Sequence, residues 1–346
     1  MEGGNFVLPG TKRVPSLFAA GCMFFLAVAG KLLLKLFGAG LLSILSSAGK
    51  TVNEELFSTV LGISYYLFFV VLPFRFYALG HPGTGEYARF KPMKPVAAVI
   101  AVVAGAVAFY LCGWANALWL MLLRSLGMHP SATQIIRMKG AAQIISRVLY
   151  IAVMPGLCEE FLFRGAILSA WEEKGSRRAI YITALLFAMI HSSSEGFPSE
   201  FIAGVLLGYI VVISGSVFTG ALFHTVFNAL SLVYMASAKS VDTAGQSLPS
   251  AAGGAGGLVS QITSILLLVL IAAAGLAEVG LLKLLHKRLG GGAIGCAAVK
   301  GEEKGPNEWI VLSCGILLAI ALYVPGILRL AGVPVPNILM IEGMLR

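Results

Sequence analysis

Long apolar windows recur along almost the whole sequence, and they constrain the fold more than any other feature. A helix needs roughly 20 mainly apolar residues to cross a hydrocarbon core of about 30 Å. Windows of about this length lie at about 15–38, 57–78, 95–123, 148–170, 178–192, 199–214, 217–237, 260–285 and 308–329. The sequence therefore predicts an all-α, polytopic transmembrane helix bundle of about eight to nine spans, in a single membrane-embedded domain over residues 1–346.

The composition agrees with a membrane protein rather than a soluble one. Hydrophobic residues make up 58% of the chain and charged residues 12%, whereas about a quarter of the residues of a soluble domain are charged. The net charge of +9 comes from Lys and Arg residues scattered over short loops, which follows the positive-inside rule rather than a nucleic-acid-binding pattern. We therefore expect an integral membrane protein, in the plasma membrane of a prokaryote, with membrane lipids and no nucleic acid as partners.

The segment 124–147 does not fit the simplest topology. If the N-terminus is inside, the basic loops around 89–94, 174–178 and 283–304 also fall inside, as the positive-inside rule requires. The basic residues of 124–147 then fall outside. Either 131–147 forms an interfacial amphipathic helix, or the span count is wrong at this point.

Ionisable residues interrupt one predicted span. Glu159, Glu160 and Arg164 lie within the window at 148–170, and each central ionisable group costs about 2.5–3.5 kcal/mol on insertion scales. Glu160 and Arg164 are four residues apart, so they share a helix face and can form an ion pair. Glu159 is rotated by about 100° from Glu160 and has no partner on its own helix. Its carboxylate is therefore the first candidate for a functional group.

Histidines in the following spans can meet this carboxylate. His191 ends the next predicted span, and His224 and Asn228 lie one helical turn apart two spans later. Glu159 and His191 lie roughly 18 and 20 Å along their helices from the basic loop between them, and His224 lies roughly 12 Å beyond the preceding turn. The similar heights predict that these side chains form one site.

A carboxylate combined with imidazoles can activate water, either directly as a general base or through a bound metal. Glu159, His191 and His224 could supply a three-ligand zinc site with an open position for water. Asn228 could donate its amide hydrogen to a developing oxyanion, and His224 could do the same. The residues alone leave the metal-dependent and metal-independent mechanisms open.

The three motifs resemble those of the CPBP intramembrane protease family, which includes CAAX prenyl endopeptidases and bacteriocin-processing or immunity proteins. The family motifs Glu-Glu-x-x-x-Arg, Phe-x-x-x-His and His-x-x-x-Asn occur here in order, at Glu159, Glu160 and Arg164, at Phe187 and His191, and at His224 and Asn228. The resemblance covers about residues 148–238, which we expect to be the catalytic core.

The resemblance implies hydrolysis of a peptide bond within the membrane, in a membrane-associated or prenylated protein or peptide. It further implies that Glu159 and His191 activate water. Arg164 would hold Glu160. His224 and Asn228 would stabilise the oxyanion. Both a zinc-dependent mechanism and a metal-independent glutamate mechanism fit such a family, so the metal stays open.

Other interpretations compete with a protease. Glu160 and Arg164 could be a purely structural ion pair, and His224 and Asn228 could form ordinary interhelical hydrogen bonds. A proton- or ion-coupled transporter would also carry ionisable residues in the bilayer, although the inverted repeats with broken helices typical of transporters are not visible. A non-catalytic immunity or scaffold protein that kept the motifs would have the same sequence pattern, so only an activity assay separates it from an enzyme.

Overall fold

The protein is described by a computed structural model, which covers residues 15–80, 84–130, 138, 140–172, 175–237, 255–289 and 308–333. Over these ranges the chain folds into helices and turns, without a strand. Eight helices in this part of the chain are long and apolar enough to cross a membrane. The predicted all-α polytopic bundle is therefore confirmed.

The helical elements follow one another in the chain with short connections, α marking α-helix and η π-helix. They are α1 (Leu17–Ser47), α2 (Glu54–Tyr65), η1 (Tyr66–Val71), α3 (Leu72–Gly80), α4 (Thr84–Tyr87), α5 (Pro95–Ser125), α6 (Ala141–Arg147), η2 (Val148–Val153), α7 (Met154–Glu160), η3 (Phe161–Ile167), α8 (Leu168–Trp171), α9 (Ser176–His191), α10 (Phe197–Ser214), α11 (Val217–Ser237), α12 (Ala255–Arg288) and α13 (Glu308–Leu330). Two spans are composite: α2, η1 and α3 run on without a break, as do α6 to α8.

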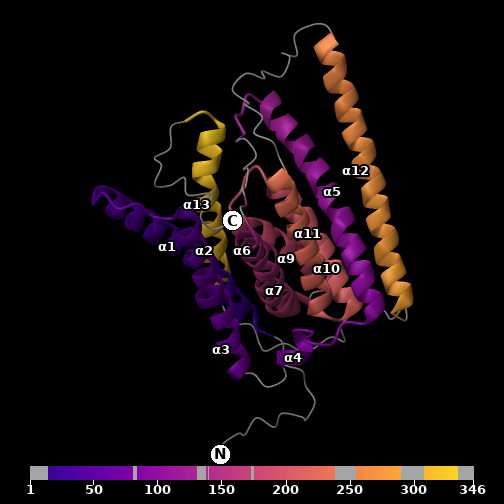
Figure 1. Cartoon of the computed structure of the whole chain (residues 1–346). Helices are drawn as coiled ribbons and strands as arrows, with labels where there is room; N and C mark the ends of the chain where they lie inside the picture. Colours follow the sequence, from indigo (N-terminus) through magenta and orange to yellow (C-terminus); the bar gives the residue numbers. More distant parts are fainter. Residues whose placement is uncertain are drawn as a thin grey trace, which may run out of the picture.

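The helices form three groups (Figure 1). The composite helix α6–α8 lies in the centre with α9, α10 and α11, while α5 and α12 lie on one side and α1, α2, α3 and α13 on the other. The most extensive contacts join α1 to α13, α9 to α10, and α5 to both α11 and α12. The central group is thus enclosed between two outer groups of helices.

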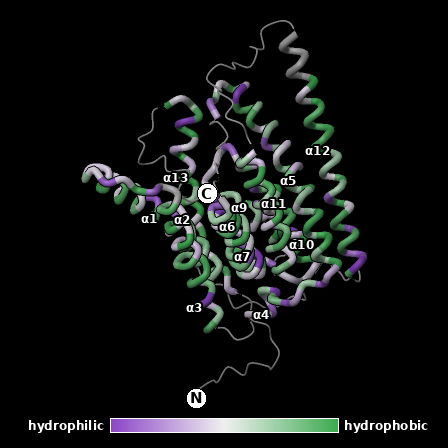
Figure 2. The backbone as a smooth tube through the Cα atoms, viewed as in Figure 1, coloured by the Kyte–Doolittle hydropathy of each residue, from purple (hydrophilic) through white to green (hydrophobic). Residues whose placement is uncertain are grey.

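The outer surface of the bundle is apolar. Figure 2 shows hydrophobic positions along most of α5 and α12, with hydrophilic positions mainly toward helix ends. Large apolar side chains are exposed there, including Leu276 at 74% and Val99 at 64%. The last turn of α12 carries His286, Lys287 and Arg288. Exposed apolar surface bounded by basic helix ends is what a lipid-facing helix requires.

A tight turn connects α10 to α11. α10 ends at Ser214, Gly215 has a φ of 66°, and α11 begins at Val217. Glycine reaches this left-handed conformation without a steric penalty, since it lacks a Cβ atom. The turn predicted at 214–216 is therefore present, and α11 packs back against both α10 and α7.

Three predicted boundaries differ from the structure. α1 continues to Ser47, beyond the predicted end at 38. Residues Ala141–Arg147 run directly into η2, so they begin the span instead of forming a separate interfacial helix; no Pro or Gly interrupts the helix there. The rest of that predicted interfacial helix, 131–137 and 139, lies outside the described residues.

Helix α9 is shorter than a full span. Its 16 residues are about 24 Å long, less than the roughly 30 Å of a hydrocarbon core. It is accordingly absent from the eight spanning candidates in the described ranges. The C-terminal end of α9, which carries His191, is therefore packed within the protein.

Candidate active site

Arg164 anchors the first motif in the interior of the bundle. Its side chain is fully buried, and Nη1 donates to Glu160 Oε1 at 3.1 Å. Nη2 donates to the carbonyl of Gly204 on α10 at 2.9 Å. The predicted ion pair is thus present, and the guanidinium also ties η3 to α10 through a charge-assisted hydrogen bond.

Glu160 has a second partner that its own helix does not reveal. His224 Nδ1, on α11, lies 3.1 Å from the same Oε1 atom. α11 can come this close because Gly220 lies one turn before His224. A Cβ atom at Gly220 would lie 2.9 Å from Glu160 Oε2. Glu160 therefore links Arg164 to His224, which is more than the architectural role expected for it.

Phe187 separates the two imidazoles. Its ring centroid lies 4.8 Å from that of His191 and 5.7 Å from that of His224. The guanidinium of Arg164 lies 4.7 Å from the same ring, within the range of a cation–π contact. The aromatic residue of the second motif thus forms an apolar wall that fixes both histidine rings.

His191 presents one specific nitrogen to Glu159. Nδ1 lies 2.7 Å from the carbonyl oxygen of Phe187, and a carbonyl can only accept, so Nδ1 carries the hydrogen. Nε2 then faces Glu159 Oε2 at 3.9 Å, too far for a direct hydrogen bond. Oε2 is buried and has no hydrogen-bond partner among the described residues. The two atoms face a common point.

Two residues of the earlier helices complete these surroundings. The hydroxyl of Tyr66, in η1, donates to Glu159 Oε1 at 2.8 Å. Lys31, in α1, is 6% exposed and donates from Nζ to the carbonyls of Ile190 at 2.8 Å and His191 at 3.3 Å. Lys31 had a sequence signal, since a lysine within an apolar span needs a partner. Tyr66 had none, because it lies in the run Tyr-Tyr-Leu-Phe-Phe.

Asn228 lies on α11 one turn beyond His224 and is half-buried. The structure records no hydrogen bond from its side chain to a described residue. Five of the six predicted site residues are therefore brought into direct or near contact, namely Glu159, Glu160, Arg164, His191 and His224. Asn228 borders them from the same helix as His224.

The predicted zinc ligands are divided between two pairs. His191 faces Glu159, whereas His224 Nδ1 faces Glu160. Within the described ranges, no group of three or more His, Cys, Asp or Glu side chains could hold a metal ion. As they lie, the side chains do not fit a three-ligand zinc site, and zinc dependence stays an untested prediction.

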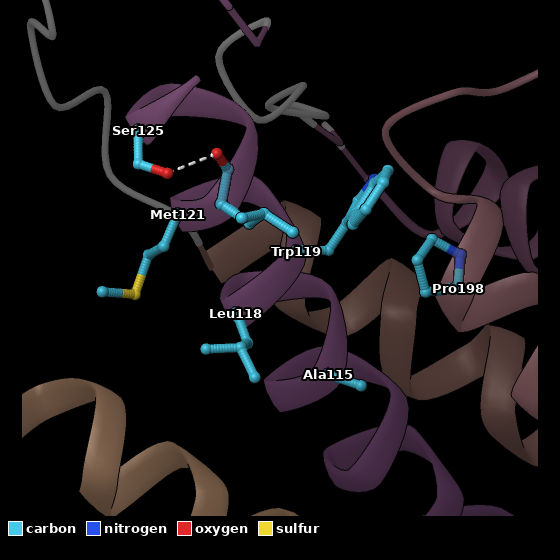
Figure 3. A pocket seen from close by; sticks show the side chains of 7 residues that line it. Ala115, Leu118, Trp119, Met121, Ser125 and Pro198 are labelled. Carbon is cyan, nitrogen blue, oxygen red and sulfur yellow. Dashed lines mark hydrogen bonds between the residues drawn. The ribbon is translucent and has the colours of Figure 1, made fainter. Parts of the chain in front are cut away.

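A cavity of about 510 Å³ lies beside the C-terminal half of α5 (Figure 3). It is lined by Ala115, Leu118, Trp119, Met121, Leu122, Ser125 and Pro198. Trp119 Nε1 donates to the carbonyl of Ser194 at 2.9 Å, in the loop that follows His191. The cavity thus adjoins that loop, but none of the six predicted site residues lines it.

Comparison with known proteins identifies the region that carries the motifs. Residues 141–230 match the family model described as Type II CAAX prenyl endopeptidase Rce1-like. Searches of curated proteins and of solved structures found no significant match. All six predicted site residues lie within 141–230, whereas Lys31 and Tyr66 lie outside it. Residues 141–230 are therefore an Rce1-like type II CAAX prenyl endopeptidase domain, which confirms the resemblance to the CPBP family of membrane proteases.

Proposed function

We propose that this protein is an intramembrane endopeptidase that hydrolyses a peptide bond of a lipidated or membrane-associated protein or peptide, with water activated by Glu159 and His191. The Rce1-like domain supports endopeptidase chemistry at the level of the family. The observation that carries the proposal is the pair of facing atoms Glu159 Oε2 and His191 Nε2, 3.9 Å apart.

Two acceptors at this separation can share one water molecule, which donates a hydrogen to each of them. Glu159 Oε1 is already held by Tyr66, so Oε2 is the oxygen available to the water. As the water oxygen attacks the substrate carbonyl carbon, Glu159 takes its proton as a general base. The carbonyl π-electrons move to the oxygen and form an oxyanion. The proton then passes to the leaving amine as the carbon–nitrogen bond breaks.

The oxyanion needs hydrogen-bond donors placed before the reaction begins. We assign this role to the amide of Asn228 and to Nε2 of protonated His224. The Nδ1 atom of His224 is engaged by Glu160, whose carboxylate stabilises the charged imidazole. Arg164 in turn compensates the charge of Glu160. The second carboxylate thus supports the oxyanion side of the site rather than the water.

The test is cleavage by the full-length protein in detergent, using a prenylated CAAX peptide, its unprenylated form and a peptide library. We expect Glu159→Gln and His191→Ala to lower kcat/KM by about 10²–10⁴-fold. Glu278→Gln is the matched control, because Glu278 is 1% exposed within α12 and lies outside the matched domain. Full cleavage by both site variants, with unchanged Tm, would refute the proposal.

The same assay separates an enzyme from a non-catalytic immunity or scaffold relative, which would cleave none of the peptides. Metal analysis and a chelator distinguish the two catalytic mechanisms. The glutamate mechanism proposed for Glu159 requires that chelation leave kcat unchanged. Loss of activity that added Zn²⁺ restores would instead support a metal held by Glu159, His191 and His224 after a rearrangement of these side chains.

A further inference from the structure

The end of α9 lies in a place where backbone groups need protein partners. The last four carbonyls of a helix have no partner within it. Water satisfies them at a protein surface, but a membrane interior offers none. Because α9 ends at His191 inside the bundle, its final carbonyls must accept hydrogen bonds from elsewhere in the protein.

All four of these carbonyls have donors. Ser192, with a φ of 56°, turns its N–H back to the carbonyl of Met189 at 3.2 Å. The hydroxyl of Tyr323, on α13, donates to the carbonyl of Ala188 at 2.8 Å. The remaining two carbonyls, of Ile190 and His191, both accept from Lys31 Nζ, at 2.8 and 3.3 Å.

The ammonium of Lys31 suits this position electrostatically. The C-terminus of a helix carries a partial negative charge, which a nearby cation stabilises. Lys31 is 6% exposed, and a buried ammonium in a span needs such a partner. α1 contributes no residue to the matched domain, yet its lysine reaches across 160 positions in the sequence to the backbone of His191.

α1 and α13 act on this region together. They make one of the most extensive helix contacts in the bundle, and α13 adds a second connection, in which Arg329 Nη2 donates to Glu195 Oε1 at 3.0 Å. Glu195 lies in the loop after α9. The two helices thus hold the last turn of α9 and the loop that follows it from outside the Rce1-like domain.

We propose that Lys31 is a positioning residue for His191, an inference that rests on the proposed function. Lys31 does not reach the reacting atoms. It fixes the backbone of the last turn of α9, from which the imidazole extends toward Glu159. The Nδ1 bond to Phe187 sets the ring orientation within α9, while Lys31 sets the position of this end of the helix relative to α7.

The test compares Lys31→Met with Lys31→Arg, and Lys35→Met is the matched control one turn along the same helix. A displacement of about 1 Å in a site can cost about 100-fold in rate. We expect Lys31→Met to lower kcat by about 10–100-fold with KM within about twofold, in molecules that keep their Tm. Lys31→Arg, which retains cationic donors, should lose less, and Lys35→Met should match the wild type.

Amide hydrogen exchange provides a measurement that needs no substrate. Lys31→Met should speed exchange in peptides covering 188–196, whereas Lys35→Met should not. Unchanged kcat and exchange in Lys31→Met, an equal effect of Lys35→Met, or no benefit from Lys31→Arg would overturn the proposal. If Glu159→Gln retains full activity, the proposed chemistry fails independently, and the exchange experiment still decides whether Lys31 holds the end of α9.

Discussion

Tyr66→Phe removes one hydroxyl from the second span and tests how Glu159 is held. The hydroxyl donates to Glu159 Oε1 at 2.8 Å, and both side chains are buried. A hydrogen bond to a charged group contributes about 1.5–3 kcal/mol. If the whole of this contribution orients the carboxylate for catalysis, its loss lowers kcat/KM by about 10–150-fold, at 1.4 kcal/mol for each factor of ten.

The assay is steady-state cleavage of the best peptide substrate, combined with a double-mutant cycle. Tyr65→Phe is the control, because Tyr65 is buried beside Tyr66, with ring centroids 5.1 Å apart. Tyr66→Phe should have little further effect in the Glu159→Gln background, since the two residues act through one interaction. Wild-type kcat/KM in Tyr66→Phe, or an equal loss in Tyr65→Phe, would show that this hydrogen bond does not position the base.

Three further substitutions test the rest of the site. Gly220→Ala should destabilise the protein by about 1–3 kcal/mol, because the new methyl group would lie 2.9 Å from Glu160 Oε2; Gly280→Ala, which meets open space, should leave Tm nearly unchanged, and equal Tm values would contradict the close packing. Arg164→Lys should lower Tm and activity together, because an ammonium cannot reproduce the planar fork that reaches two acceptors; wild-type behaviour would argue against that bridging role. Asn228→Ala should lower kcat by about 10²–10³-fold with little change in KM, and a change confined to KM would assign the amide to substrate binding instead.

The number and order of the spans could be predicted because the bilayer demands long apolar helices, and a run of apolar residues is visible in a sequence. Boundaries were less certain, since packing decides how far a helix continues. α1 extends to Ser47 past its two lysines because Lys31 finds acceptors on α9. α9, in contrast, stops after 16 residues, where other helices supply partners for its carbonyls.

Within the site, the contacts that follow from one helix were predictable, and those between helices were not. The pairing of Glu160 with Arg164 follows from their spacing of four residues. The missing partner of Glu159 comes from Tyr66, 93 positions earlier. Helical periodicity gives the face on which a side chain lies, but it does not state which helix packs against that face or at what rotation.

The two adjacent glutamates illustrate how rotation about one helix divides a site. Glu160 is fully buried, and Arg164 and His224 share its Oε1 atom, so its charge is compensated in place. Glu159 points about 100° away, is 8% exposed, and meets a tyrosine hydroxyl and an imidazole instead of a guanidinium. A carboxylate whose charge is committed to a buried cation is a poor proton acceptor, whereas one with a free oxygen beside an imidazole can accept a proton and release it again. The same pair of residue types can therefore serve two purposes, because their neighbours on the other helices differ.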